Sequence, residues 1–168
     1  HPEDEIVTLD LYKAGIGPLK AEDLPSLTGP KNESSRNDPV LRYAYQWADC
    51  DKYVIAAPLW NLGLPGILKC YIDYAWCGGI TFVYTENGPK GLLENKKGIY
   101  IATRGGDYSS DLMKENEMGA RYISTLFRVF GIEDFQTLYL DKMDVWGTDI
   151  PKAMSEGIER AEMIARDF

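Results

Sequence analysis

The sequence contains almost no histidine, and this shortage excludes several kinds of chemistry. The single histidine is His1, at the start of the chain. A Ser-His-Asp relay, a Cys-His pair or a histidine-built metal site therefore has no place in the body of the protein. We expect no metal ion.

Cysteine is also scarce, with only Cys50, Cys70 and Cys77 present. Their number is odd and their spacing does not match that of metal ligands. Such cysteines are typical of reduced thiols in a cytoplasmic protein, where they act as small buried apolar residues.

Long apolar runs and excess positive charge are absent as well. The longest apolar run, residues 54–60, is far shorter than the roughly 20 residues that cross a bilayer. Lys and Arg number 18 against 26 Asp and Glu, which gives a net charge of −8. Such a surface repels nucleic-acid phosphates and anionic lipids, so we expect neither as a partner.

The hydrophobic pattern predicts an α/β protein with a central parallel sheet. A chain of 168 residues favours one domain spanning 1–168. Short β-rich runs predict strands, helical spacing predicts helices between them, and the Gly- and Pro-rich stretch 14–38 predicts a loop. This alternation indicates a parallel sheet. The expected strands are 5–12, 53–57, 97–103 and 135–140, with a brief extended segment at 81–84, and the expected helices are 38–51, 63–79, 115–130 and 151–168.

All four predicted helices carry apolar residues at helical spacing. They are Val40, Leu41, Ala44, Tyr45 and Ala48 in 38–51, and Ile67, Leu68, Tyr71, Ile72 and Ala75 in 63–79. In helix 115–130 the stripe consists of Met118, Tyr122, Leu126 and Val129, and Gly131 ends the helix. In helix 151–168 we expect Met154, Ile158, Ala161 and Ala165 to face inward.

Two loops that follow predicted strands are candidates for a ligand site, because open parallel sheets bind ligands beyond the carboxyl ends of their strands. One loop places a large aromatic, Trp60, in a rigid turn. The other contains a glycine pair whose N–H groups can approach a ligand closely. A glycine pair is also common in a plain turn, and Trp60, Tyr84, Tyr108 and Tyr122 have alternative roles as packing residues. The loops are Pro58-Leu59-Trp60-Asn61-Leu62-Gly63 and Arg104-Gly105-Gly106-Asp107-Tyr108.

Four spaced motifs in one order resemble the FMN-dependent NADH-azoreductases, which are flavodoxin-like NAD(P)H:quinone oxidoreductases with a three-layer sandwich fold. The resemblance covers residues 6–168. The motifs are Ala57-Pro58-Leu59-Trp60-Asn61-Leu62, Leu68-Lys69-x-Tyr71-Ile72-Asp73, Gly79-Ile80-Thr81-Phe82-x-Tyr84-Thr85-Glu86-Asn87-Gly88-Pro89-x-Gly91-Leu92 and Thr103-Arg104-Gly105-Gly106.

The resemblance implies a cytoplasmic homodimeric enzyme that takes electrons from NADH and passes them through FMN to quinones or azo compounds in a ping-pong cycle. It also implies that Tyr84 reaches toward the site of a neighbouring subunit, and that Trp60 and Tyr84 line the substrate site. Hydride transfer through a flavin needs no side-chain acid, so a chain without an internal histidine can perform it. The implied cofactor-binding residues are Pro58, Leu59, Trp60, Asn61 and Leu62 along the isoalloxazine ring, and Thr103, Arg104, Gly105, Gly106 and Tyr108 around its pyrimidine end.

The sequence departs from this family at its beginning. Family members start with a strand, a Ser-rich phosphate loop and a helix, which would occupy roughly 20 to 40 residues before His1. That strand would be central, between segments 5–12 and 53–57. We therefore expect the natural protein to extend beyond His1, and residues 1–168 alone to bind FMN poorly.

Two other interpretations stay open at this point. A non-catalytic electron carrier of the flavodoxin type would also suit the acidic composition, because carriers dock on basic partners. A chain that binds no flavin is the third. Absorbance of the purified protein, followed by mixing with NADH, distinguishes the three.

Overall fold

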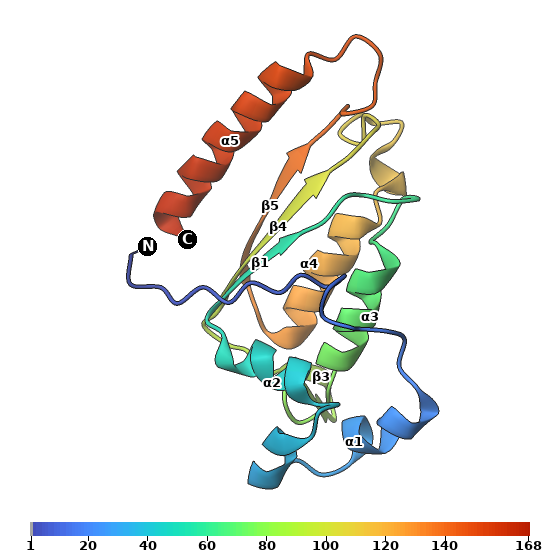
Figure 1. Cartoon of the computed structure of the whole chain (residues 1–168), viewed down its shortest axis with the longest axis vertical. Helices are drawn as coiled ribbons and strands as arrows, with labels where there is room; N and C mark the ends of the chain where they lie inside the picture. Colours follow the sequence, from blue (N-terminus) through green and yellow to red (C-terminus); the bar gives the residue numbers. More distant parts are fainter. Residues whose placement is uncertain (1) are drawn as a thin grey trace.

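A three-stranded parallel sheet lies at the centre of the protein, with helices on both faces (Figure 1). The computed structural model describes residues 2–168, and His1 lies outside them. The strands are β1 (Lys52–Ala56), β4 (Lys97–Thr103) and β5 (Asp134–Leu140), and β4 is in the middle. Three of the four predicted strands are confirmed, and so is the flavodoxin-like α/β class.

One face of the sheet carries the main core, beneath α2 (Arg42–Asp49), α3 (Gly66–Ala75) and α4 (Gly119–Phe130). Alternate side chains of the strands, such as Tyr53, Tyr100 and Ala102, point into it because successive residues of a strand face opposite sides. The predicted end of α4 is correct: Gly131 has φ 91° and donates to the carbonyls of Phe127 and Arg128.

The beginning and the stripe of α4 differ from the prediction. The segment before it forms a short 3₁₀ helix, η3 (Lys114–Asn116), so Met118 precedes the helix and is exposed. Leu126 is buried as expected, whereas Tyr122 and Val129 are half-buried at the edge of the stripe. The fully packed residues are Gly119, Ala120, Ile123, Leu126, Phe127 and Phe130.

Helix α5 (Ile150–Asp167) covers the other face, and its predicted stripe is wrong by one position. Met154, Ile158 and Ala165 are exposed, and only Ala161 is partly buried as expected. Gly157 lies against the sheet instead, where an added Cβ would be 3.1 Å from the Leu140 side chain. The helix turns its small residues inward because the leucines of β5 already fill that space.

The predicted strand 5–12 is also wrong. A strand needs a hydrogen-bonded neighbour, and no strand within residues 2–168 pairs with this segment. It runs extended to a turn in which Lys13 and Ala14 donate to the carbonyl of Asp10, and the carboxylate of Asp4 is 2.7 Å from Lys52 Nζ. The predicted loop 14–38 contains short helices, η1 (Ala21–Asp23), α1 (Leu24–Thr28) and η2 (Glu33–Asn37).

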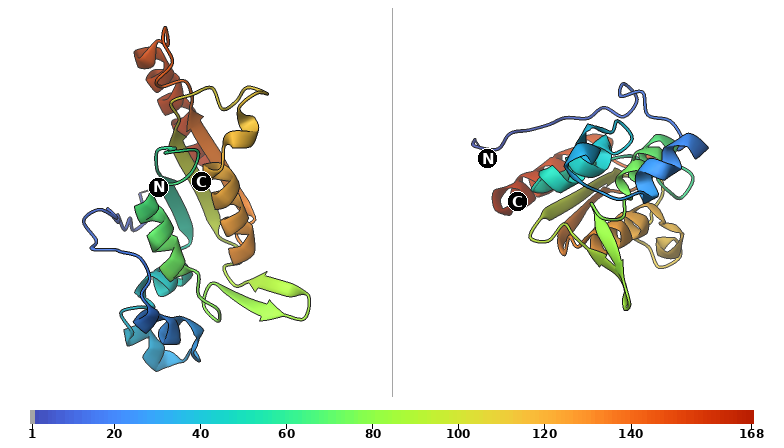
Figure 2. Two further views of the ribbon diagram at one scale, coloured as in Figure 1. Left: turned by 90° about the vertical axis from the view of Figure 1, so that its right-hand side faces the viewer. Right: turned by 90° about the horizontal axis from the view of Figure 1, so that it is seen from below.

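A two-stranded hairpin, β2 (Phe82–Thr85) and β3 (Gly88–Gly91), projects from the body of the protein (Figure 2). Gly91 fixes its base, because a Cβ there would be 2.1 Å from the backbone nitrogen of Gly131. The hairpin lies at the amino-end side of the sheet, opposite the edge where the strands end (Figure 1).

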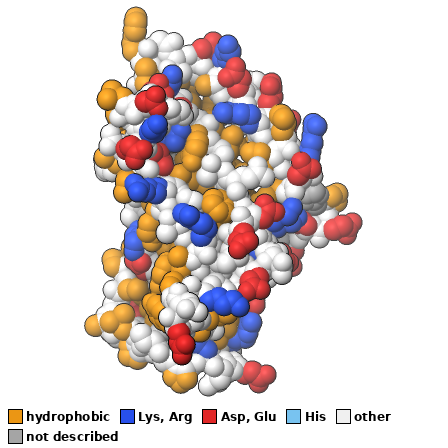
Figure 3. All heavy atoms as spheres, turned by 180° about the vertical axis from the view of Figure 1, so that it is seen from behind, with side chains coloured by type: hydrophobic (Ala, Val, Ile, Leu, Met, Phe, Trp, Pro, Cys, Tyr) orange, Lys and Arg blue, Asp and Glu red, His pale blue; other side chains and the backbone are white. Residues whose placement is uncertain are grey.

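The surface mixes charges of both signs. Figure 3 shows acidic and basic side chains interspersed over one face of the molecule, with apolar side chains between them. None of the helices within residues 2–168 is both long and apolar enough to span a membrane.

Candidate functional site

The two loops singled out in the sequence meet at the carboxyl edge of the sheet. The backbone N–H of Leu59, after β1, donates to the carbonyl of Thr103, the last residue of β4, at 2.9 Å. Parallel register brings the ends of these strands together. The structure therefore places Pro58–Leu62 beside Thr103–Gly106, as the sequence predicted.

The first loop contains a tight and strained turn. Trp60 and Gly63 exchange two backbone hydrogen bonds of 2.9 and 3.0 Å. Between them, Asn61 and Leu62 have φ values of 50° and 72°, as in a type I′ turn. Asparagine tolerates this region, but a bulky leucine rarely adopts it, and such strain clusters at ligand sites. The carbonyl of Leu62 accepts from Met118 N–H at 2.9 Å, which joins the turn to the start of α4.

Trp60 stands on this turn with 52% of its surface exposed. A packing role would have buried it, so the structure leaves its ring available as an apolar wall. Leu59 lies beneath, against α4: a Cβ on Gly119 would be 3.0 Å from its Cδ1.

The second loop directs three backbone donors away from the body of the sheet. The carbonyls of Arg104, Gly105 and Gly106 all accept hydrogen bonds, of 3.1, 3.0 and 3.0 Å, from amides of the loop after β5 (residues 142–144). In a trans peptide the N–H points opposite to the preceding carbonyl, so the N–H groups of residues 105–107 point away from that loop. Because β4 lies between β5 and β1, this direction is toward the Trp60 turn.

These three N–H groups donate to no acceptor within residues 2–168. Successive free amides form a concavity that binds negatively charged or carbonyl oxygens. Neither glycine has a φ in the left-handed region. Their contribution is therefore room for close neighbours rather than unusual backbone freedom, because a Cβ would lie 3.3 Å from Asp144 at Gly105 and 3.2 Å from Tyr108 at Gly106.

The Arg104 side chain turns away from this concavity. It is 3% exposed, and its Nε and Nη2 lie 2.5 and 2.6 Å from the two carboxylate oxygens of Asp141. Its guanidinium carbon lies 3.7 Å from the ring centroid of Tyr139. The Arg104 backbone also faces β5 and the loop after it, because its N–H donates to Leu140 and its carbonyl accepts from Met143. Tyr108, at the end of the loop, is half-buried.

Asp141 and Ser109 complete this arrangement, and the sequence analysis did not select them. The Ser109 hydroxyl binds the Asp141 carboxylate and lies 3.2 Å from Arg104 Nη2. The rule that ligands bind beyond the carboxyl ends of parallel strands would have selected Asp141, because this residue follows β5 directly. At the surface of the same loops Lys142 Nζ is 2.9 Å from Asp107, and this hydrogen bond raises the pKa of Lys142.

Tyr84 lies far from the other predicted site residues. It is 73% exposed on the hairpin, where its ring makes an edge contact with Phe82 at a centroid distance of 5.1 Å. The carboxyl edge is at the opposite end of the sheet (Figure 1). Tyr84 therefore does not line the site of its own chain.

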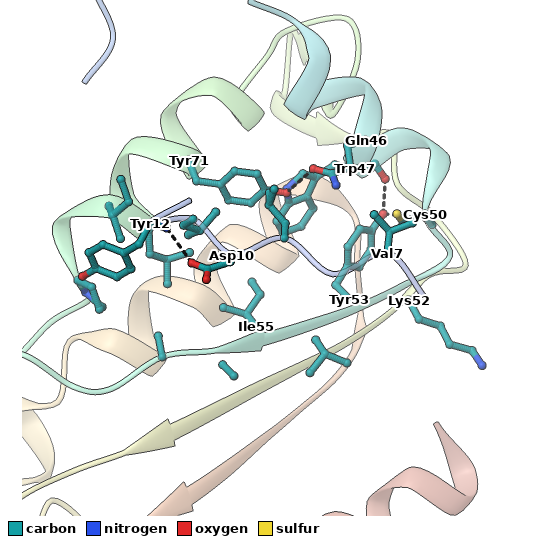
Figure 4. A pocket seen from close by; sticks show the side chains of 18 of the residues that line it. Val7, Asp10, Tyr12, Gln46, Trp47, Cys50, Lys52, Tyr53, Ile55 and Tyr71 are labelled. Atoms are coloured by element: carbon teal, nitrogen blue, oxygen red, sulfur yellow. Dashed lines mark hydrogen bonds between the residues drawn. The ribbon is translucent and has the colours of Figure 1, made fainter. Parts of the chain in front are cut away.

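A second hollow, of about 350 Å³, lies between β1 and the segment 7–12 (Figure 4). Two of its hydroxyls have partners: the Tyr71 hydroxyl donates to Gln46 Oε1 at 3.1 Å, and the Tyr53 hydroxyl donates to backbone carbonyls of Trp47 and Cys50. The buried Nε1 of Trp47, which also lines the hollow, has no partner among the described residues. Three successive free amides beside an exposed aromatic ring are found at the carboxyl edge, and we place the candidate site there.

Comparison with known proteins agrees with this architecture. A family model described as the flavodoxin-like fold matches residues 1–164. An FMN-dependent NADH:quinone oxidoreductase from Clostridium perfringens is 53% identical over 168 residues, which cover all of this chain and 83% of that protein. The chain belongs to the flavodoxin-like FMN-dependent NADH:quinone oxidoreductase and azoreductase family.

Solved structures of this family superpose closely. The azoreductase from Bacillus anthracis str. Sterne has a TM-score of 0.87 at 31% identity, and azoreductase AzrA has 0.88 at 31% identity. Each alignment covers all of this chain and 84% of the other. The family resemblance stated from the motifs is thereby confirmed.

Proposed function

We propose that this protein is an FMN-dependent NADH:quinone oxidoreductase that also reduces azo compounds. The observation that carries the proposal is the pairing, at one sheet edge, of an exposed aromatic wall with three unpaired backbone amides. The flavodoxin-like family relatives carry the same activity in their names.

The residues at this edge fit the flavin ring of FMN. A planar heterocycle needs an apolar surface and fixed donors for its carbonyl oxygens. Pro58, Leu59, Trp60, Asn61 and Leu62 would supply the surface, and the N–H groups of residues 105–107 would supply donors. Thr103, Arg104 and Tyr108 would flank the pyrimidine end, with the free N–H groups following Arg104 in the chain.

FMN, when bound, supplies the ability to accept a hydride and pass two electrons on. The protein holds and orients the ring and excludes water from it. Its fixed amides stabilise negative charge at the carbonyl end, since preorganised donors need no rearrangement when the charge develops. None of these tasks requires a histidine.

A homodimer is part of the proposal. Tyr84 is remote from its own site and exposed on a projecting hairpin, which is a suitable position for contact with a second copy. Trp60 of one subunit and Tyr84 of the other would then line the acceptor site. Light scattering at micromolar concentration tests this: a monomeric mass with full turnover would contradict the shared site.

The proposal also places the enzyme in the cytoplasm, without nucleic-acid or membrane partners. The three cysteines form no disulfide among residues 2–168, which suits a reducing compartment. The net charge of −8 disfavours both kinds of anionic partner.

Absorbance and rapid mixing test the activity. The purified protein should bind FMN, NADH should bleach the bound flavin, and a quinone should restore its colour. A flavin that quinone reoxidises but NADH does not reduce would indicate an electron carrier. Absence of flavin binding by the full-length protein, including any residues that precede His1, would refute the proposal.

A further inference from the structure

Arg104 and Asp141 form an ion pair that is largely buried. The side-chain exposures are 4% for Arg104 and 16% for Asp141, and the contact is bidentate. Ser109 binds the outer carboxylate oxygen, and the Tyr139 ring covers one face of the guanidinium. The bidentate hydrogen bonds fix the geometry of the pair. Separation of the two side chains is costly, because each would remain charged and buried without its partner.

The pair also links two loops. Arg104 begins the loop after β4 and Asp141 begins the loop after β5, while the three carbonyl-to-amide hydrogen bonds described above join the same loops. The direction of the free N–H groups of residues 105–107 depends on these bonds. Any motion of the loop after β5 would therefore turn those N–H groups.

We propose that Arg104 and Asp141 are positioning residues that hold these amides toward the flavin ring, an inference that rests on the proposed function. Arg104 binds Asp141, and this pair holds the loop after β5 whose amides fix the peptide groups of residues 104–107. Arg104 does not act on the flavin through its charge. Its positive charge is already balanced by the carboxylate, and its side chain does not face the site.

The two possible roles of Arg104 predict different directions for the shift in the midpoint potential of bound FMN. If Arg104 supplied positive charge to the flavin, Arg104→Gln would lower the midpoint potential of bound FMN and Asp141→Asn would raise it. If the pair positions the loop, both variants weaken the stabilising amides and both lower the potential. The double variant should then be no worse than the worse single variant, because the second change removes nothing further.

FMN titration and potentiometry of the full chain carry the first test. We expect Arg104→Gln and Asp141→Asn each to weaken FMN binding about tenfold or more, with potentials shifted in the same direction. Lys114→Gln is the matched control: it removes a cation from the same β4–α4 connection, where Lys114 pairs with exposed Asp111. Unchanged affinity in both pair variants, or potentials shifted in opposite directions, overturns the proposal.

Amide hydrogen exchange without flavin carries the second test. Asp141→Asn should speed exchange at the amides of residues 142–144 while the amides of β4 stay protected, since only the link between loops is lost. Unchanged exchange at residues 142–144 overturns the proposal. If the pair variants do not fold, Ser109→Ala replaces them, with smaller changes in the same direction.

The two hypotheses fail separately. A full-length wild-type protein, including any residues that precede His1, that binds no FMN refutes the proposed function, and the exchange experiment still decides whether the pair holds the loop. A wild-type chain that binds FMN, with variants that bind it equally well, refutes only the positioning role.

Discussion

Leu62 has a strained backbone conformation and lies in the Trp60–Gly63 turn of the candidate site. Its φ of 72° costs a non-glycine residue about 1–2 kcal/mol. Glycine would remove that strain, although it loses about 0.5–1 kcal/mol through the freedom of the unfolded chain. We expect Leu62→Gly to leave the free energy of unfolding unchanged or raise it by up to about 1 kcal/mol, measured in urea.

Leu92→Gly is the control for this prediction. Leu92 is exposed to the same extent, 43%, but its φ is not positive. Its replacement should therefore destabilise the protein. If both variants lose the same free energy, the Trp60–Gly63 turn stores no strain.

Gly105 and Gly106 provide space at the site. A Cβ would lie 3.3 Å from Asp144 Cβ at Gly105, and 3.2 Å from the Tyr108 ring at Gly106. Neighbours at such distances can yield, so Gly105→Val and Gly106→Val should cost only about 1 kcal/mol of stability. Their branched side chains would displace Asp144 and Tyr108 and so shift the loop that carries the free amides, and fluorescence titration should show FMN affinity reduced about tenfold or more. Stability loss with unchanged FMN affinity would remove this loop from the site.

At the scale of elements, the end of α2 depends on two side chains from outside the helix. Lys96 Nζ donates to the carbonyls of Ala48 and Cys50, and the Tyr53 hydroxyl donates to those of Trp47 and Cys50. Carbonyls at a helix C-terminus lack partners within the helix and attract cations. These contacts fix the end of α2 to the start of β1 through Tyr53 and to the start of β4 through Lys96.

Lys96→Met should therefore lower the free energy of unfolding by about 1–2 kcal/mol. Lys90→Met, at a side chain that is 65% exposed and whose Nζ is 3.6 Å from Glu94, should change it by less than about 0.5 kcal/mol. Equal effects in urea denaturation would show that the cap contributes nothing beyond a surface charge.

The elements also show how far sequence reasoning reaches. Strands 97–103 and 135–140 are predictable because each is a short apolar run with an obligatory place in a parallel sheet. Segment 5–12 has a strand-like composition, but pairing decides whether a strand forms. In α5 two stripes of similar character lie one residue apart, and the choice between them depends on the leucines of β5.

The candidate site was predictable in its loops but not in its internal links. The two loops follow neighbouring parallel strands, so they lie side by side at the carboxyl edge of the sheet whatever their side chains are. That Arg104 turns toward Asp141 depends on the loop after β5, whose residues carry no motif of their own. The stability of this pair depends on Ser109 and Tyr139, which are separated from one another in the sequence and come together only in the folded chain.

At the scale of the whole molecule, the net charge of −8 should oppose the approach of NADH, which is itself an anion. Raising ionic strength from 0.01 to 0.15 M shortens the Debye length from about 30 to about 8 Å. We expect the second-order rate constant for flavin reduction by NADH, measured by stopped flow, to rise about twofold or more.

Reoxidation by an uncharged quinone provides the control for this prediction, because its rate should not depend on salt. A rate for NADH that falls as salt is added would mean that the site attracts anions despite the overall charge.

The loops of the site are fastened to β4, α4 and each other by backbone hydrogen bonds within the chain itself. Ring binding should then involve no coupled folding. Calorimetry should give a heat-capacity decrease no larger than the apolar area of one planar ring explains. Association should follow a single exponential, without a slow phase from conformational selection.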